Sequence, residues 1–280
     1  MIREATTEMP SPFPVDPLAE FDPTEEYRRS VVNGILESYN SNYDFLVEAI
    51  QNAVDAIEDA ALAKLPGPYL LEVTVNLKDN WLGVLDTGIG LGAEEIVKAF
   101  KPYVSLKQTD EMRTLRGVQN PYRGYKGVGL TFLAYGTDDV RFHSKRDETL
   151  IKARMQYGHA WATGERDDIA HVDADDEASP LEDMPRGTYI RVQFSGSTRP
   201  RSLVHLAAEP KAWGAIVRTR TAAGQVLLDR ETIAPIELTL HVISGDGEEH
   251  HDELDAAFLY PHLVDREPAY RFQDLNAYFE

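Results

Sequence analysis

The spacing of apolar residues switches along the chain between the period of a helix and the period of a strand. Between residues 42 and 63, apolar positions recur every three or four residues, which predicts one long helix with a single buried stripe. The stripe consists of Leu46, Ile50, Val54 and Ile57. Residues 69–77 instead alternate between apolar and polar, and residues 81–85 form a second apolar run after a polar turn. This second pattern predicts two consecutive strands.

The remaining elements follow the same two periods. We expect a helix or a helical hairpin over residues 23–40 and further helices over residues 93–100, 128–135 and 203–223, the last split at Pro210. Further strands are expected near residues 139–144, 149–156, 188–194 and 236–243. Helices and strands mixed in this order indicate an α/β (α+β) fold.

The same elements suggest how the chain is divided. Residues 1–22 are rich in proline and acid and predict a flexible N-terminal arm. Residues 23–232 form the main predicted domain, and residues 233–280 the start of a following domain or a C-terminal extension. Inside the main domain, residues 101–123 combine glycine, proline and many charges, which is typical of a mobile lid.

Composition narrows the classes of protein that fit. The net charge of −19 disfavours direct DNA binding by this portion, because phosphate contacts need clustered lysine and arginine. No apolar run approaches the roughly 20 residues of a membrane-spanning helix. The absence of cysteine excludes disulfides and thiolate metal sites and fits a cytoplasmic protein.

Two acidic stretches are separate from the main motifs. Residues 166–183 predict a solvated insertion between strands rather than a site. Residues 245–255 hold His250 and His251 among acidic residues, and this pattern favours an exposed hairpin loop over the alternative of a metal site.

The long predicted helix carries the first chemical motif. Glu48, Asn52 and Asp55 lie at positions i, i+4 and i+7, which places them on one face of the helix and apart from the apolar stripe. Magnesium prefers oxygen ligands and binds substrate phosphates, so the amide oxygen of Asn52 fits its demands. Glu48 is placed to polarise a water for attack on phosphorus. The alternative is a surface helix with scattered polar residues.

A second motif follows the second predicted strand. Asp86 ends that strand, and Gly88 and Gly90 come directly after it. Glycines allow a ligand to approach the backbone closely, and a carboxylate beside them can accept a hydrogen bond from an amino group such as the exocyclic amine of adenine. The alternative is an ordinary Asp-Thr-Gly turn.

The third motif is glycine-rich and leads into the helix predicted at residues 128–135. It reads Gly124-Tyr-Lys126-Gly127-Val128-Gly129-Leu130-Thr131. Backbone N–H groups at a helix start bind anions, and Lys126 can meet a phosphate. The segment is not a Walker-type phosphate loop, because no Lys-Ser or Lys-Thr follows, and no βαβ unit frames it as a dinucleotide fingerprint. The alternative is a flexible loop.

In this order and at these separations, the three segments resemble the nucleotide pocket of the GHKL ATPases. That family includes DNA gyrase-type topoisomerases, large heat-shock chaperones, sensor histidine kinases, MutL repair proteins and MORC proteins. Ser105-Leu-Lys107 is similar to a lid motif of MutL and MORC proteins, and Gly187-Thr188 is similar to a Gly-Thr whose hydroxyl helps to hold adenine through water. The resemblance covers about residues 43–195 and implies a two-layer sandwich, with a mixed sheet and helices on one face.

The resemblance also implies a role for each matching position. Glu48 would be the general base, Asn52 the magnesium ligand and Asp86 the residue that reads adenine. Asp55 would add a polar contact near the base, and Gly127 and Gly129 would cradle phosphate. The other residues expected to contact the nucleotide are Gly88, Gly90, Lys107, Gly124, Lys126, Val128, Leu130, Thr131 and Thr188.

The presence of Glu48 and the stretch Asn52-Ala-Val-Asp55-Ala resembles chaperone, MutL, MORC and sacsin-like ATPase domains more than histidine kinases. The expected function is magnesium-dependent ATP binding and slow hydrolysis, driving lid closure and conformational change or dimerisation of a larger machine. The alternatives are a nucleotide-gated binding module that does not hydrolyse ATP, and a GHKL-type protein kinase. Expected partners are ATP, a second copy of the chain bound in a nucleotide-dependent homodimer, and a partner protein or downstream domains. Phe13, Leu18 and Phe21 of the arm are candidates for docking on that second copy.

Overall fold

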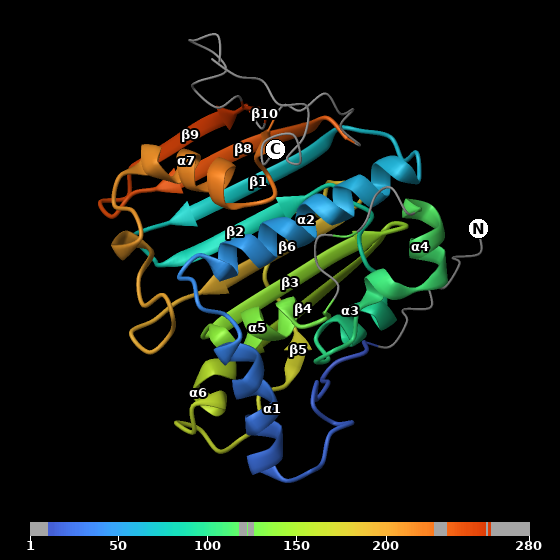
Figure 1. The fold of residues 1–280 in the computed structure, drawn as a ribbon, viewed down its shortest axis with the longest axis vertical. Helices are drawn as coiled ribbons and strands as arrows, with labels where there is room; N and C mark the ends of the chain where they lie inside the picture. The colour runs from blue at the N-terminus through green and yellow to red at the C-terminus, as the bar shows by residue number, and fades with distance from the viewer. Residues whose placement is uncertain (1–10, 118–121, 123–125, 227–233, 256, 259–280) are drawn as a thin grey trace, which may run out of the picture.

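The computed structural model describes residues 11–117, 122, 126–226, 234–255 and 257–258. Within these residues the chain forms an α+β structure with seven α-helices and an eight-stranded mixed sheet (Figure 1). The helices are α1 (Glu25–Glu37), α2 (Asp44–Leu62), α3 (Ala93–Ala99), α4 (Asp110–Arg116), α5 (Gly129–Gly136), α6 (Gly158–Ala162) and α7 (Pro210–Arg220), with 3-10 turns at Leu106–Gln108 and Leu203–His205. The strands of the large sheet are β1 (Tyr69–Asn76), β2 (Trp81–Asp86), β3 (Asp139–Arg146), β4 (Thr149–Gln156), β5 (Val172–Ala174), β6 (Gly187–Gln193), β8 (Ile236–Ile243) and β9 (Glu249–Leu254).

The order of the strands in the large sheet is β5-β4-β3-β6-β2-β1-β8-β9. The pair β1 and β8 is parallel, and the other neighbouring pairs are antiparallel. A separate small sheet pairs β7 (Gln225–Val226) with β10 (Ala257–Phe258). In the middle of the large sheet, Asp86 at the end of β2 pairs with Thr188 of β6. Two predicted site residues that are far apart in the sequence therefore lie side by side.

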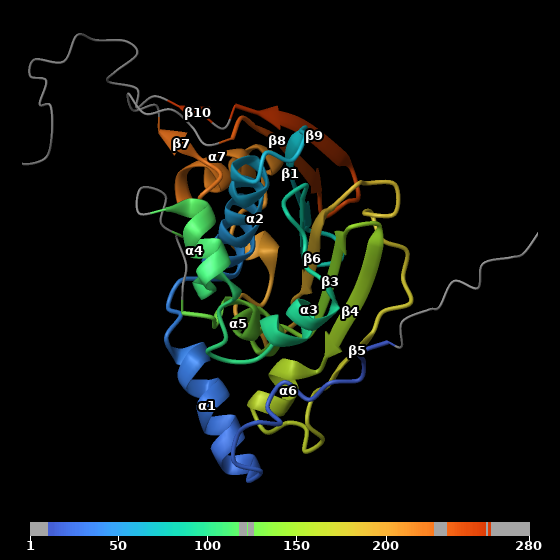
Figure 2. The same cartoon turned by 90° about the vertical axis from the view of Figure 1, so that its right-hand side faces the viewer.

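Helices cover one face of the large sheet. Seen from the side, α2, α4 and α7 lie on the same side of the strands (Figure 2). The apolar stripe of α2 is fully buried and belongs to the same core as Val73 of β1 and Val84 of β2. Burial of a large aliphatic side chain of this kind contributes about 1.5–3 kcal/mol. The stripe therefore anchors α2 on the sheet, and the polar residues of the helix lie on a different face.

Several elements predicted from the sequence are confirmed. The helix predicted over residues 42–63 is α2, and the strands predicted over residues 69–77 and 81–85 are β1 and β2. The predicted split at Pro210 is also present, because Pro210 begins α7. Proline suits the first position of a helix, where its missing N–H has no partner to lose.

The described part of the N-terminal arm differs from the prediction of a flexible segment over residues 1–22. Leu18 is fully buried, and Val15 pairs with Val172 through an isolated antiparallel bridge. Asp16 also accepts a hydrogen bond from Arg28 at 3.0 Å. Because Leu18 is buried within its own chain, it is not exposed to dock on a second copy. The proline-rich composition of the arm gave no sign of these contacts. Residues 1–10 lie outside the described part.

The acidic segment 166–183 is not wholly the solvated insertion that its composition predicted. Its residues 172–174 form β5 at the edge of the sheet, and Asp175 is buried with 5% of its surface exposed. Arg141 donates to Asp175 at 3.0 Å, and His143 lies 2.8 Å from it. Both partners come from β3, so an inspection of the acidic segment alone could not identify the buried residue.

The C-terminal part that the structure describes extends the same sheet. β8 pairs with β1 along its whole length, from Ile236 opposite Tyr69 to Ile243 opposite Asn76. Residues 236–243 and 249–254 therefore belong to the same sheet as the strands of the main predicted domain. The division of the chain at residue 233 stays a prediction, and residues 256 and 259–280 lie outside the described part. Residues 245–255 form a turn followed by the edge strand β9, rather than a loop alone. None of the helices in the described ranges combines the length and apolar character needed to cross a membrane.

Candidate functional site

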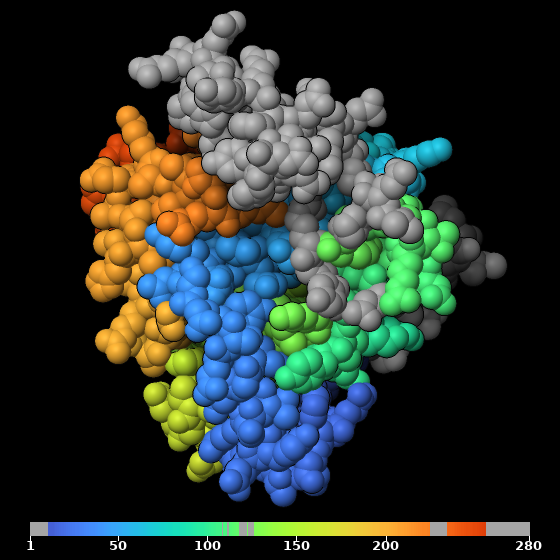
Figure 3. Space-filling model, in the orientation of Figure 1, coloured from blue at the N-terminus to red at the C-terminus, as the bar shows by residue number. Residues whose placement is uncertain are grey.

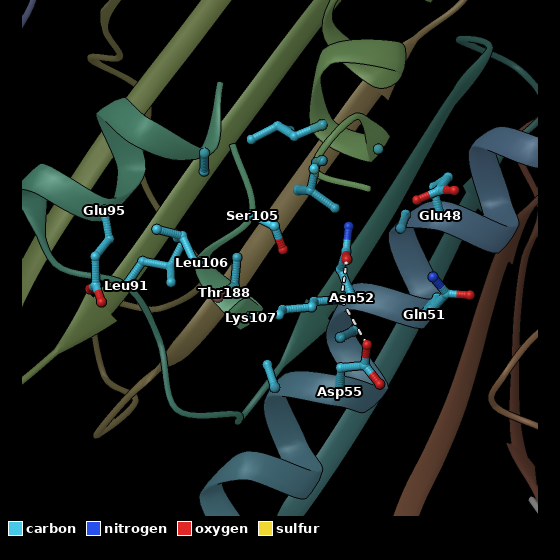
Figure 4. A pocket seen from close by; sticks show the side chains of 18 of the residues that line it. Glu48, Gln51, Asn52, Asp55, Leu91, Glu95, Ser105, Leu106, Lys107 and Thr188 are labelled. Atoms are coloured by element: carbon cyan, nitrogen blue, oxygen red, sulfur yellow. Dashed lines mark hydrogen bonds and ion pairs between the residues drawn. The ribbon is translucent and has the colours of Figure 1, made fainter. Parts of the chain in front are cut away.

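A cavity of about 550 Å³ opens between α2, the end of β2, the lid segment 104–109 and the start of α5. Its volume lies within the range of roughly 300–1,000 Å³ that is typical of small-molecule sites. Figure 4 shows side chains from these separate segments around one space. The predicted site residues that line it are Glu48, Asn52, Asp55, Asp86, Gly90, Lys107, Lys126, Gly127, Val128, Gly129, Leu130 and Thr188.

Three predicted site residues are not among those lining the cavity. Gly88 packs against α2, where an added Cβ would lie 2.6 Å from Ala56. Thr131 is buried, and its hydroxyl donates a long hydrogen bond of 3.5 Å to the backbone of Phe100. Gly124 lies outside the described residues. Gly88 and Thr131 therefore support the wall of the cavity rather than face its interior.

The polar face of α2 meets a lysine from the lid. Lys107 Nζ donates to Asn52 Oδ1 at 2.9 Å and to Asp55 Oδ2 at 2.7 Å (Figure 4). Asp55 is almost fully buried, so its charge requires such a partner. The two oxygens therefore already stabilise a positive charge at this end of the cavity.

Glu48 lies one helical turn before Asn52, and no cation of the described residues forms a salt bridge with it. Its Oε1 accepts a hydrogen bond of 3.0 Å from the hydroxyl of Tyr39, whose ring stacks on Phe132 with centroids 3.8 Å apart. Desolvation raises the pKa of Glu48, although the hydrogen bond from Tyr39 and the charge of Lys107 oppose that shift. A carboxylate with a raised pKa is a better proton acceptor than an ordinary one.

Asp86 lies at the opposite side of the cavity, at the end of β2. It is 3% exposed, and its Oδ1 accepts a hydrogen bond of 2.8 Å from the backbone N–H of Gly88. Burial raises the pKa of Asp86 to about 7, while the backbone N–H groups of Gly88 and Thr188 act in the opposite direction. The carboxyl group is therefore available in both protonation states near neutral pH.

The start of α5 presents bare backbone to the cavity. Gly127 has φ +68°, and an added Cβ there would lie 2.5 Å from the backbone of Val104. At Gly129 an added Cβ would lie 2.2 Å from Glu48 Oε2, so only glycine leaves room for that carboxylate. The N-cap residue Val128 makes no side-chain cap hydrogen bond. The first N–H groups of α5 are therefore not capped by that residue.

The lid is tied to α2 by an arginine that the sequence reasoning did not identify. Arg116 of α4 is 4% exposed, and its guanidinium donates to Asp59 Oδ1 at 2.6 Å, Glu58 Oε2 at 3.0 Å and the Asp55 carbonyl at 2.7 Å. Tyr122 covers the guanidinium with its ring centroid 4.0 Å from Cζ and donates to Asp59. Figure 3 shows the surface of the molecule in the orientation of Figure 1. On that side the lid, in green, lies beside α2, in blue.

Tyr39 and Arg116 are the main residues of the site that the sequence motifs missed. Tyr39 precedes α2 and lies outside all three motifs, so its link to Glu48 depends on the fold. The sequence did not distinguish Arg116 from the many other charged residues of the lid. One available signal was the cluster Asp55, Glu58 and Asp59, whose spacing gathers three acids on one side of α2 and requires a cation nearby.

Comparison of the chain with protein-family models and with curated proteins finds no match.

Proposed function

We propose that this chain binds magnesium-ATP in the cavity and hydrolyses it slowly, in the manner of the GHKL ATPases that its motifs resemble. The observation that carries the proposal is that Glu48, Asn52, Asp86 and the backbone at Gly127 and Gly129 line a single cavity. A proton acceptor, a carboxylate for an amino group and bare backbone for phosphates are the groups that this reaction needs. If the three motifs were unrelated surface features, nothing would require their residues to line the same cavity.

The adenine would lie at the end of the cavity formed by Asp86 and Thr188. The buried carboxylate of Asp86 accepts a hydrogen bond from the exocyclic amine, and a base without that donor would leave the carboxylate unsatisfied. The phosphates would lie toward α5, where backbone N–H groups and the helix dipole favour negative charge.

The residues at the phosphate end fit a magnesium ion. Asn52 and Asp55 offer oxygen atoms, the donor type that magnesium prefers, and these atoms already hold the ammonium of Lys107. When bound, magnesium would neutralise negative charge on the phosphates. Lys107 would have to release Asn52 and could then pair with a phosphate oxygen, so opening and closing of the lid would accompany nucleotide binding.

Glu48 would act on the attacking water. Its carboxylate accepts a proton as the water oxygen forms a bond to the γ-phosphorus, and the bond from that phosphorus to the β–γ bridging oxygen breaks to give ADP and phosphate. Tyr39 holds the carboxylate in place through its hydroxyl. Nucleotide-dependent dimerisation remains part of the proposal, with a contact surface other than Leu18.

The test is to compare the wild type with Glu48→Gln. We expect the variant to bind ATP with unchanged affinity by calorimetry and to release phosphate about 10²-fold more slowly, because the amide cannot accept the proton. Glu94→Gln serves as a matched control, since it makes the same change at an exposed residue of α3 that does not line the cavity. A Glu48→Gln variant that hydrolyses ATP at the wild-type rate would contradict the assignment. Wild-type binding without phosphate release would instead favour the nucleotide-gated module.

A further inference from the structure

A histidine-rich cluster lies on β8 and β9, the two strands at one edge of the large sheet (Figure 1). His241 of β8 pairs directly across the strands with His251 of β9, and Glu249 lies two residues before His251. Side chains two residues apart on a strand share a face, so these three residues point to the same side. Leu238, Leu240 and Val242 alternate with His241 along β8 and are buried in the core under the helices. The cluster is therefore separate from the cavity.

We infer that His241, Glu249 and His251 form a binding site for a divalent transition-metal ion, with zinc as the best match. The Nε2 atoms of His241 and His251 lie 3.6 Å and 3.7 Å from the same oxygen of Glu249. All three ligand atoms lie within 4.8 Å of one another. Two atoms that ligate one tetrahedral zinc at about 2.0–2.1 Å are separated by about 3.4 Å, so little movement is needed to reach that geometry.

The present contacts leave one imidazole nitrogen of the cluster without a hydrogen-bond partner among the described residues. This atom is Nε2 of His241, which is buried. Its 3.6 Å separation from Glu249 allows an ion pair but is too long for a hydrogen bond. A metal ion between the two groups would supply the missing interaction.

The stacked arrangement of the two imidazoles requires one adjustment. Their ring centroids are 3.9 Å apart with an interplanar angle of 17°. A metal lies in the plane of each ligating ring, so one ring must tilt to share an ion with the other. The His251 side chain is 67% exposed at the sheet edge, which gives it room to tilt.

The donor set decides which ion the site selects. Imidazole nitrogen favours zinc, copper, nickel and iron, whereas magnesium prefers oxygen ligands. Three protein ligands leave a fourth position for water or for a group from another molecule. The net charge of −19 also attracts cations to the chain. The bound ion would link the edge strand β9 to β8.

The experiment is calorimetric titration of the full chain with zinc chloride, without nucleotide. We expect wild-type binding with 1:1 stoichiometry and at least about tenfold weaker binding by His251→Asn, a loss of about 1.4 kcal/mol. His250→Asn is the matched control, because His250 directly precedes His251 on β9 and belongs to the opposite face of the sheet. This variant should bind zinc as the wild type does. Magnesium chloride should give no signal at this site, so a nucleotide-free titration with it should be unaffected by His251→Asn.

A second measurement uses thermal unfolding. Zinc should raise the unfolding temperature of the wild type and of His250→Asn, since an ion that binds the folded state stabilises it, and should raise that of His251→Asn much less. The proposal is overturned if the wild type does not bind zinc, if His251→Asn binds as tightly as the wild type, or if His250→Asn weakens binding equally.

Discussion

Two buried aspartates on opposite faces of the same sheet differ in the partners that surround them. Asp86 is 3% exposed and lines the cavity on the helical side, whereas Asp175 is 5% exposed and binds side chains on the other face. Desolvation acts on both carboxyl groups and by itself raises a carboxyl pKa. For Asp86 it prevails, and the pKa rises to about 7. For Asp175 it is outweighed by His143, the backbone of Glu177 and Arg141, so the pKa is lowered.

The difference shows how burial alone fails to identify a functional carboxylate. Asp175 is paired with a guanidinium and an imidazole, which makes it part of the structure that holds the acidic segment on the sheet. Among the described residues, the hydrogen bonds to Asp86 come from backbone N–H groups and none from a basic side chain. A buried carboxyl group that lacks a charged partner and faces a cavity is suited to a ligand that brings its own donor.

The largest expected effect is on stability, from Asp175→Asn. Removing this charge leaves the buried His143 without its carboxylate and leaves Arg141 with only the exposed Glu177 as an acidic partner. The free energy of unfolding should therefore fall by about 3 kcal/mol in urea at pH 7. Asp173→Asn, two residues earlier and exposed on β5, should have little effect. The pKa of Asp175 is lowered by folding, so its contribution is present above the unfolded value and is lost as the pH falls. Equal stability of wild type and Asp175→Asn at pH 7 would mean that the contacts of Asp175 with Arg141 and His143 do not stabilise the fold.

The next largest effect is on nucleotide binding, from Asp86→Asn. Loss of a charged acceptor for the adenine amine should cost about 1.5–3 kcal/mol, which weakens ATP binding about tenfold or more by calorimetry. The stability of the folded protein should not fall in the same way. Because folding raises the pKa of Asp86, its contribution to stability is complete at low pH and is lost as the pH rises through about 7. At pH 8 the variant should therefore be at least as stable as the wild type. Unchanged ATP affinity would remove the adenine assignment.

The same contrast explains what the sequence could and could not predict. The motif carrying Asp86 follows a strand and is local, so both its position and its proposed role could be predicted from adjacent glycines. The long helix and its polar face were predictable for the same reason, since i, i+4 and i+7 spacing depends only on helix geometry.

The partners of Asp175 could not be predicted in this way. They come from β3, and the pairing depends on how β3, β4 and β5 align in the sheet. Tyr39 with Glu48, and Arg116 with the acids of α2, are long-range or irregular contacts of the same kind. Composition predicted a lid and a solvated acidic segment, but it gave no sign that Arg116 in the first and Asp175 in the second are buried.

The smallest expected effect is a pH dependence of ligand affinity that only Asp86 should produce. With a pKa of about 7, the ionised fraction of its carboxyl group rises from about one tenth at pH 6 to about nine tenths at pH 8. The adenine amine donates more strongly to the ionised form, so affinity should rise with pH by up to about tenfold across this interval. Adenosine is the preferred probe, because the terminal phosphate of ATP also gains charge in this range. Calorimetry at pH 6, 7 and 8 should give a rising affinity for the wild type and a flat profile for Asp86→Asn. Parallel profiles for the two proteins would show that another group titrates, and the contrast between the two buried aspartates would then not extend to ligand binding.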